Sequence, residues 1–187
     1  MLKMLKRGIF LDRDGVINVD RDYVFRIEDF TLIDGVLEAC QELKRRGFSL
    51  IVITNQSGIA RGFYTETDLA KLNAHIFKIF EQAQAPLSGI YYCPHLPNAP
   101  IEAYRSICRC RKPAPGLFLQ AAEEHAIDLS RSFAFGDKDR DLEAAERAGI
   151  PARILLGKNG LSIPEKTGSA TGTARSLLDS IKLGLVS

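Results

Sequence analysis

The sequence lacks a hydrophobic run long enough to cross a membrane. Its longest purely apolar runs, such as residues 50–53, are far shorter than the roughly 20 residues that a membrane helix requires. The first ten residues include lysines but no apolar segment of the kind that signal peptides contain. We therefore expect a cytoplasmic protein that has no membrane partner.

The chain also has no excess of one charge, no internal repeat and no low-complexity linker. Its 25 lysines and arginines nearly balance its 23 aspartates and glutamates, and the net charge of +2 argues against a protein that binds nucleic acid through bulk charge. Hydrophobic residues make up 45% and charged residues 26% of the chain, as in ordinary globular domains. The length of 187 residues is close to that of one domain, so we expect a single domain over residues 1–187 and a monomer.

The sequence does contain an alternation of apolar runs and amphipathic segments. The predicted strands are residues 8–11, 50–53, 89–92, 132–135 and 152–156. Helices are predicted between them, one opening with a capping box at Thr65 and Asp68 and another having Pro115 at its first position. Residues 157–173 are predicted as a surface loop and 174–183 as a closing helix. This order predicts an α/β fold, a Rossmann-like three-layer domain with helices on both faces of a mostly parallel sheet.

Polar residues follow three of the predicted strands at the point where each strand ends. The segments are Asp12-Arg13-Asp14-Gly15, Thr54-Asn55-Gln56-Ser57-Gly58 and Gly136-Asp137-Lys138-Asp139-Arg140-Asp141. Aspartate and glycine commonly make turns after strands, but ligands also bind beyond the carboxyl ends of parallel strands. Three such segments together predict one site for phosphate chemistry, with Asp139 and Arg140 as solvated charges at a helix start.

Three of the four cysteines cluster with a histidine. Cys93, His95, Cys108 and Cys110 form the pattern C-x-H-x12-C-x-C, whereas Cys40 lies on a helical face and is predicted to be a buried free thiol. In a cytoplasmic chain such a cluster indicates a metal site more often than disulfides. Three thiolates and an imidazole suit tetrahedral Zn²⁺, and four protein ligands predict a closed, structural site. The metal would order a loop over about residues 93–110.

The ordered set of motifs resembles the haloacid dehalogenase-type phosphatases. The matching residues are Asp12, Asp14, Gly15, Thr54, Lys112, Gly136, Asp137 and Asp141, and the resemblance spans residue 9 to about 156. It implies an Mg²⁺-dependent phosphomonoester hydrolase. No segment is long enough for a large cap domain, so loops 18–30 and 94–110 are expected to enclose the substrate.

The resemblance implies a catalytic role for four residues. Asp12 is the nucleophile that forms an aspartyl-phosphate, and Asp14 protonates the leaving oxygen and then deprotonates the attacking water. Thr54 offers a hydroxyl and Lys112 a positive charge to the phosphoryl oxygens.

The resemblance also implies a magnesium site. Its ligands are Asp12, the backbone carbonyl of Asp14, and Asp137, because Mg²⁺ prefers hard oxygen ligands. Asp141 is expected to orient the catalytic lysine or a metal-bound water. Lys138 either contacts the substrate or is a solvated lysine, and the sequence leaves both roles open.

Within this superfamily, the zinc pattern before Arg111-Lys112-Pro113 and the run 54–62 resemble the D-glycero-D-manno-heptose 1,7-bisphosphate phosphatases, which act in making nucleotide-activated heptose for lipopolysaccharide or surface glycans. This resemblance implies a small sugar bisphosphate as substrate, cleaved at C7. The expected substrate-binding residues are Asp20, Arg21, Asp22, Tyr23, Asn55, Gln56, Ser57, Arg111 and Lys138. Pro113 favours an extended segment before it, so Arg111 is expected to reach the second phosphate. Alternatively, Arg111 neutralises the thiolate cluster.

Three other functions stay open. Histidinol-phosphate phosphatases share the zinc and core motifs, but their substrate carries an amine, which an acidic surface would recognise better than Arg111. A phosphatase acting on nucleic-acid ends predicts a basic groove with aromatic side chains, and the sequence shows no such pattern. A zinc-clamped binding module would not need Asp12, Asp14, Asp137 and Lys112 together, and a metal-dependent phosphatase assay separates it from the enzymes.

Overall fold

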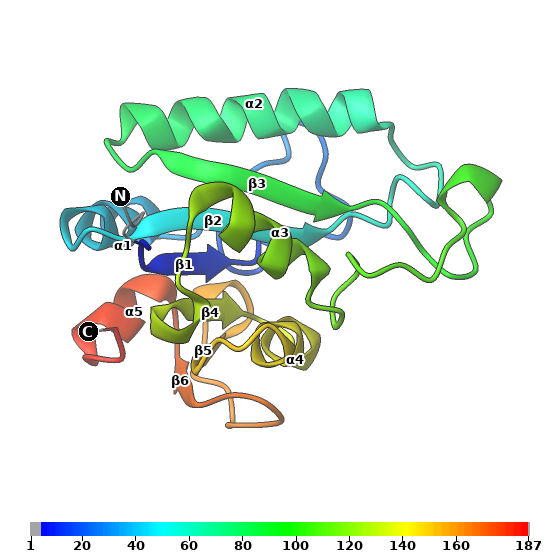
Figure 1. Ribbon diagram of the computed structural model, residues 1–187. Coiled ribbons are helices and arrows are strands. Elements are labelled where there is room, and N and C mark those ends of the chain that lie inside the picture. Colours follow the sequence, from blue (N-terminus) through cyan, green and yellow to red (C-terminus); the bar gives the residue numbers. More distant parts are fainter. Residues whose placement is uncertain (1–4, 187) are drawn as a thin grey trace.

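The computed structural model describes residues 5–186, which form a central sheet of six strands (Figure 1). The strands are β1 (Gly8–Leu11), β2 (Ser49–Asn55), β3 (Leu87–Cys93), β4 (Phe133–Gly136), β5 (Ala152–Leu156) and β6 (Gly172–Ala174). Their order in space is β3-β2-β1-β4-β5-β6, and every neighbouring pair is parallel. The predicted α/β architecture with a parallel sheet is confirmed.

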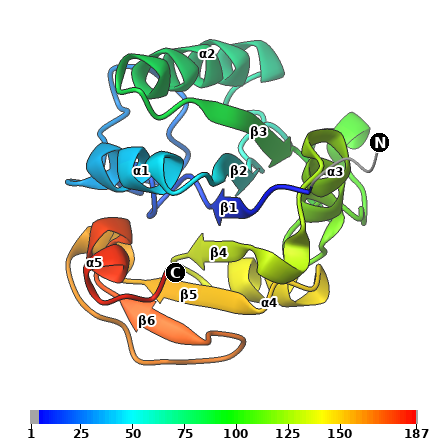
Figure 2. The same cartoon turned by 60° about the vertical axis from the view of Figure 1, so that its left-hand side comes forward.

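Helices cover both faces of this sheet (Figure 2). They are α1 (Val36–Arg45), α2 (Glu66–Gln82), α3 (Gly116–His125), α4 (Asp139–Arg147) and α5 (Leu177–Lys182), with short 3-10 turns at Glu102–Tyr104, Leu129–Arg131 and Lys158–Gly160. Apolar side chains of α1, α2 and α5 form one core layer, and those of α3 and α4 form the other. Because side chains alternate along a strand, Ile9 and Leu11 of β1 pack into the first layer and Phe10 packs into the second.

Local sequence signals explain the start of α2 and correct the start of α3. The Thr65 hydroxyl accepts a hydrogen bond from the Asp68 amide at 3.1 Å, which confirms the predicted capping box. Pro115 is the residue before α3 and not its first helical residue. Gly116 begins the helix, and its amide donates to the Arg109 carbonyl at 2.9 Å, so close that a Cβ on this residue would collide with the Arg109 carbonyl.

The largest correction concerns the C-terminal part of the chain. Residues 172–174 form the edge strand β6, where the sequence predicts the end of a loop and the start of a helix. Ala174 pairs with Leu156 of β5, and α5 begins only at Leu177, after its cap Ser176. The three-residue strand contains glycine and threonine and carries no hydrophobic alternation that would have revealed it.

The strand order positions a crevice beside β1. The chain leaves β1 toward β2 and β3 on one side and then returns to β4 on the other, which makes the gap between β1 and β4 a topological switch point. Asp12 follows β1 and Asp137 follows β4, so both reach this crevice. None of the helices in residues 5–186 is long and apolar enough to span a membrane.

Candidate active site

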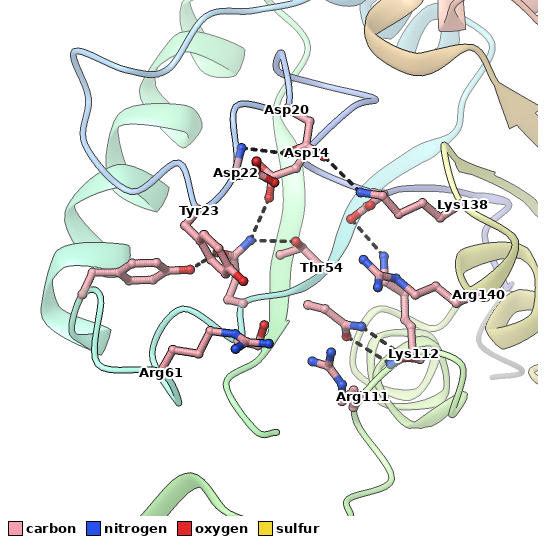
Figure 3. A pocket seen from close by; sticks show the side chains of 15 residues that line it. Asp14, Asp20, Asp22, Tyr23, Thr54, Arg61, Arg111, Lys112, Lys138 and Arg140 are labelled. Carbon is pink, nitrogen blue, oxygen red and sulfur yellow. Dashed lines mark hydrogen bonds and ion pairs between the residues drawn. The ribbon is translucent and has the colours of Figure 1, made fainter. Parts of the chain in front are cut away.

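One cavity at the carboxyl ends of the strands gathers most of the predicted site residues (Figure 3). It is lined by Asp12, Asp14, Asp20, Asp22, Tyr23, Thr54, Asn55, Gln56, Ser57, Arg111, Lys112 and Lys138. Asp137 packs beside it against Gly15, where the backbone has φ +89° and a Cβ would collide with the carboxylate. Arg21 is exposed and is not one of the lining residues.

Lys112 is the buried centre of the cavity floor. Its ammonium lies 2.9 Å from Asp12 Oδ1 and 2.8 Å from Asp141 Oδ1, and it donates to the Ile53 carbonyl at 2.8 Å. The Lys112 side chain is only 2% exposed. Burial by itself would lower the pKa of Lys112, but the two carboxylates outweigh it and raise this pKa above its ordinary value. Lys112 is therefore a fixed cation at the nucleophile predicted from the sequence.

Asn55 connects this lysine to the end of β2. The Lys112 amide donates to Asn55 Oδ1 at 3.0 Å, and Asn55 Nδ2 donates to the Lys112 carbonyl at 3.1 Å. This reciprocal pair occupies the Asn55 amide, which the sequence assigns to substrate. The backbone of Lys112 is thereby attached to the sheet.

Three carboxylates beside Lys112 form a candidate cation site. The nearest oxygens of Asp12, Asp137 and Asp141 lie within 4.8 Å of one another. Both oxygens of Asp141 are engaged, by Lys112 and by the backbone amide of Lys138. Asp137 Oδ1 is buried without a hydrogen-bond partner among the described residues, and burial together with the charge of Asp12 raises the pKa of Asp137 to about 7. A buried carboxylate oxygen without a hydrogen-bond donor fits a hard cation such as Mg²⁺.

A second group of cations lies on the rim of the cavity. Arg61, Arg111 and Arg140 all line it (Figure 3), and none forms an ion pair with a carboxylate of residues 5–186. Burial lowers the pKa of Arg111, the positive charges of Arg140 and Arg61 act in the same direction, and the sulfur groups of Cys93 and Cys108 partly oppose this shift. Arg140 is exposed, as predicted, but it lies on the cavity rim because α4 starts shortly after β4. Arg61 had no sequence signal beyond its place in the run 54–62.

Lys138 also belongs to the wall. Its ammonium lies 3.0 Å from Asp20 Oδ2 and 3.5 Å from Asp137 Oδ2. Burial would raise the pKa of Asp20, but the bond to Lys138 outweighs it and the pKa is lowered. The Asp20 amide donates to Asn159 Oδ1 at 2.8 Å. The predicted surface loop 157–173 therefore holds the backbone of a residue that lines the cavity.

The cysteine–histidine cluster lies in the loop that leads to Arg111. Sγ of Cys93 lies 3.5 Å from Sγ of Cys108 and 3.2 Å from Sγ of Cys110, and His95 Nδ1 lies 3.3 Å from Cys110 Sγ. Tetrahedral Zn–S bonds of about 2.3 Å place the sulfur atoms about 3.8 Å apart. The cluster is thus compact enough to surround one zinc ion. Cys40 is a fully buried free thiol, as predicted.

Comparison with known proteins identifies the family. The model of the haloacid dehalogenase-like hydrolases matches residues 3–149. The chain belongs to this family. A D-glycero-β-D-manno-heptose-1,7-bisphosphate 7-phosphatase of Escherichia coli O6:H1 is 45% identical to this hydrolase over 172 residues, 92% of this chain and 90% of the relative. A Vibrio cholerae protein of the same name is also 45% identical, over 96% of this chain and 94% of its own.

A solved structure has the same fold. The D,D-heptose 1,7-bisphosphate phosphatase from B. bronchiseptica, crystallised with magnesium and phosphate, is 30% identical and superposes with a TM-score of 0.79. The match covers 96% of this chain and 98% of the other.

The enclosing segments differ from the expectation for this hydrolase. Asp20, Asp22 and Tyr23 of loop 18–30 line the cavity, but no residue of loop 94–110 does. Loop 94–110 instead contacts a residue that lines the cavity, because the His95 carbonyl accepts a hydrogen bond from Arg111 Nη1 at 3.2 Å. The other enclosing side chains, Arg61 and Tyr64, come from the segment between β2 and α2.

Proposed function

We propose that this hydrolase removes the C7 phosphate of D-glycero-β-D-manno-heptose 1,7-bisphosphate and leaves heptose 1-phosphate, a step in making nucleotide-activated heptose. The observation that carries the proposal is the distribution of charge in one cavity. Its floor holds the Asp12 carboxylate, a buried lysine and a candidate cation site, and its rim holds three arginines that have no carboxylate partner among residues 5–186. The names of the relatives supply the sugar and its β anomer.

The first chemical step forms a phosphoenzyme. A carboxylate oxygen of Asp12 attacks phosphorus, the bond from phosphorus to the sugar oxygen breaks, and Asp14 gives that oxygen a proton. Lys112 and the buried Thr54 hydroxyl stabilise the charge on the phosphoryl oxygens. Mg²⁺, when held by Asp12, the Asp14 carbonyl and Asp137, offsets the repulsion between carboxylate and phosphate.

The second step releases phosphate. A water oxygen attacks the phosphorus of the aspartyl-phosphate while Asp14 accepts a proton from that water. The bond between phosphorus and the Asp12 oxygen breaks, and its electron pair returns to Asp12. The same aspartate thus acts first as acid and then as base.

The rim supports a substrate with a second phosphate. Arg111 is half-buried and faces the cavity with Arg140 and Arg61, so the three guanidinium groups repel one another until an anion lies between them. A guanidinium fork suits a phosphate better than it suits the amine of histidinol phosphate. The cavity therefore supports the bisphosphate over that alternative.

We further propose that Cys93, His95, Cys108 and Cys110 hold a structural Zn²⁺. The ion would close the loop that carries the His95 carbonyl, and that carbonyl orients Arg111. The zinc is then a support of the rim and takes no part in bond breaking.

The test is a panel of substrates with purified protein. We expect kcat/KM to be highest for the β-heptose bisphosphate, lower for fructose bisphosphate and lowest for histidinol phosphate, with Mg²⁺ required throughout. A preference for histidinol phosphate would contradict the proposed substrate. Turnover that survives removal of Mg²⁺ would contradict the proposed chemistry.

A further inference from the structure

Arg13 stands in the sequence between Asp12 and Asp14, the two carboxylates of the proposed mechanism, and it is fully buried. No part of its side chain is exposed, and it is the largest of the fully buried side chains. Burying a guanidinium is costly unless hydrogen bonds and an opposite charge compensate it. The proposed reaction gives Arg13 no role, so its contacts need an explanation.

The compensating charge is Asp14. Nη2 of Arg13 lies 2.9 Å from both carboxylate oxygens of Asp14, and Nε donates to Oδ1 at 3.2 Å. The same Nη2 donates to the carbonyl of Val24 at 2.6 Å. One guanidinium therefore joins Asp14 to the backbone of loop 18–30, the loop that carries three residues of the cavity wall.

Two more donors hold Asp14 from other directions. Asn18 Nδ2 donates to its Oδ1 at 3.0 Å, and Gln56 Nε2 donates to its Oδ2 at 3.1 Å. Gln56 is itself fixed, because Nε2 also donates to the Thr54 hydroxyl and the Tyr64 hydroxyl donates to Oε1 at 2.5 Å. Asp14 is nevertheless 18% exposed and lines the cavity.

We propose that Arg13 is a positioning residue, which sets the direction of the Asp14 carboxyl group for proton transfer and couples it to loop 18–30 through Val24. The inference rests on the proposed acid–base role of Asp14. Proton transfer requires the donor and acceptor oxygens to approach to hydrogen-bond distance, so a displaced Asp14 loses rate even when its chemistry is intact. Arg13 touches neither substrate nor metal in this role.

The leaving group distinguishes this role from a purely structural one. A sugar alkoxide needs a proton as its bond to phosphorus breaks, whereas p-nitrophenolate is a stable anion and leaves without one. The ratio kcat/KM reports the steps up to the first irreversible one, here the transfer of phosphate to Asp12. A misplaced Asp14 therefore lowers kcat/KM for the sugar phosphate and spares p-nitrophenyl phosphate.

The experiment compares Arg13→Lys and Arg13→Met on both substrates. We expect Arg13→Met to lose about 100-fold in kcat/KM on the heptose bisphosphate and less than about threefold on p-nitrophenyl phosphate. Arg13→Lys keeps the positive charge, but an ammonium group lacks the planar set of donors that binds both Asp14 oxygens and the Val24 carbonyl. Its loss in kcat/KM on the heptose bisphosphate should therefore be intermediate. If Arg13→Met does not fold, Arg13→Lys carries the same test.

Two reference variants separate the outcomes. Asp14→Asn should show the same selectivity for the sugar substrate, and Ile76→Val, a core change in α2, should lower the melting temperature and leave the ratio of the two kcat/KM values unchanged. If Asp14→Asn is selective but a folded Arg13 variant has the wild-type ratio or loses equally on both substrates, the positioning role is overturned. If Asp14→Asn itself loses equally on both, the proposed acid has failed instead.

Discussion

The floor and the rim of the cavity differ in whether their charged side chains are buried and paired. On the floor, the side chains of Asp12, Lys112 and Asp141 are 7%, 2% and 4% exposed, and each has its partner within 2.9 Å. On the rim, Arg61 and Arg140 are exposed and have no carboxylate partner among residues 5–186. The paired charges around Lys112 serve a reaction common to every substrate, whereas the unpaired guanidinium groups of the rim are available to the charge of a particular ligand.

The two regions are also built differently. Asp12 and Asp137 on the floor directly follow β1 and β4, which are paired in parallel. Lys112 is attached to the end of β2 through Asn55, and Asp141 lies buried in the first turn of α4. Rim residues come from loops and a helix start, where more of each side chain meets solvent. Changes on the floor should therefore affect all substrates and changes on the rim only some.

The largest effect is expected for Asp12→Asn, because the amide cannot attack phosphorus. Turnover should fall by about 10⁴-fold or more on the bisphosphate and on a monophosphate alike. Mass spectrometry of rapidly quenched enzyme should show a phosphate on the wild-type protein and none on the variant. A variant that still accumulates phosphoenzyme would contradict Asp12 as the nucleophile.

Next in size is Lys112→Met, which leaves two buried carboxylates without their cation. Losing one partner of a buried pair costs about 3–5 kcal/mol, so thermal unfolding without Mg²⁺ should occur at a clearly lower temperature. Activity should fall by about 10²- to 10³-fold on all substrates.

The matched control is Lys138→Met, the same change in a lysine whose side chain is 40% exposed. It should cost less stability than Lys112→Met, because the Lys138 ammonium is partly solvated and lies 3.5 Å from the buried carboxylate of Asp137. Equal destabilisation by the two variants would contradict the special position of Lys112 on the floor.

The sequence predicts the floor far better than the rim. The carboxyl ends of three strands carry Asp12, Thr54 and Asp137. Parallel pairing brings such residues to one edge of the sheet. The contact between Asp20 and Asn159, by contrast, joins residues 139 positions apart in two irregular loops, and no periodicity reports it. The edge strand β6 escaped prediction for a related reason, because it is too short to show alternation.

The sequence does not reveal the surroundings of two charged residues. Arg140 is solvated at a helix start, as predicted, but the sequence does not show that α4 begins at the cavity. The complete burial of Arg13 has no signal in the sequence, because it depends on the contacts of its guanidinium with Asp14 and with the Val24 carbonyl.

A smaller and selective effect is expected for Arg111→Ala. If this guanidinium binds the distal phosphate, kcat/KM on the bisphosphate should fall about tenfold to a few hundredfold, as for a lost charged hydrogen bond. On a heptose monophosphate that lacks the C1 phosphate, the loss should nearly vanish. Arg109→Ala is the control, because this exposed arginine of the same loop does not line the cavity. Equal losses on both substrates would assign Arg111 to the thiolate cluster instead.

The smallest effect on activity is expected when the zinc cluster is broken by Cys108→Ser. Metal analysis should find one zinc ion per wild-type chain and much less in the variant, whereas Cys40→Ala should keep its zinc, because Cys40 is a core residue of α1 and not part of the cluster. We expect kcat/KM to fall by only about tenfold, in the range of other groups that support a site without touching the substrate.

The loss should stay small because other contacts hold the zinc loop at both ends. Asn55 still binds the backbone of Lys112, and the Tyr104 hydroxyl still donates to Glu66 of α2 at 2.8 Å. The remaining loss should concern the bisphosphate more than a monophosphate, since the His95 carbonyl that orients Arg111 lies in the loop. Wild-type protein isolated without zinc would contradict the metal site. If Cys108→Ser instead lost as much activity as Lys112→Met on every substrate, the loop would belong to the floor, because zinc would then be needed to place Lys112 itself.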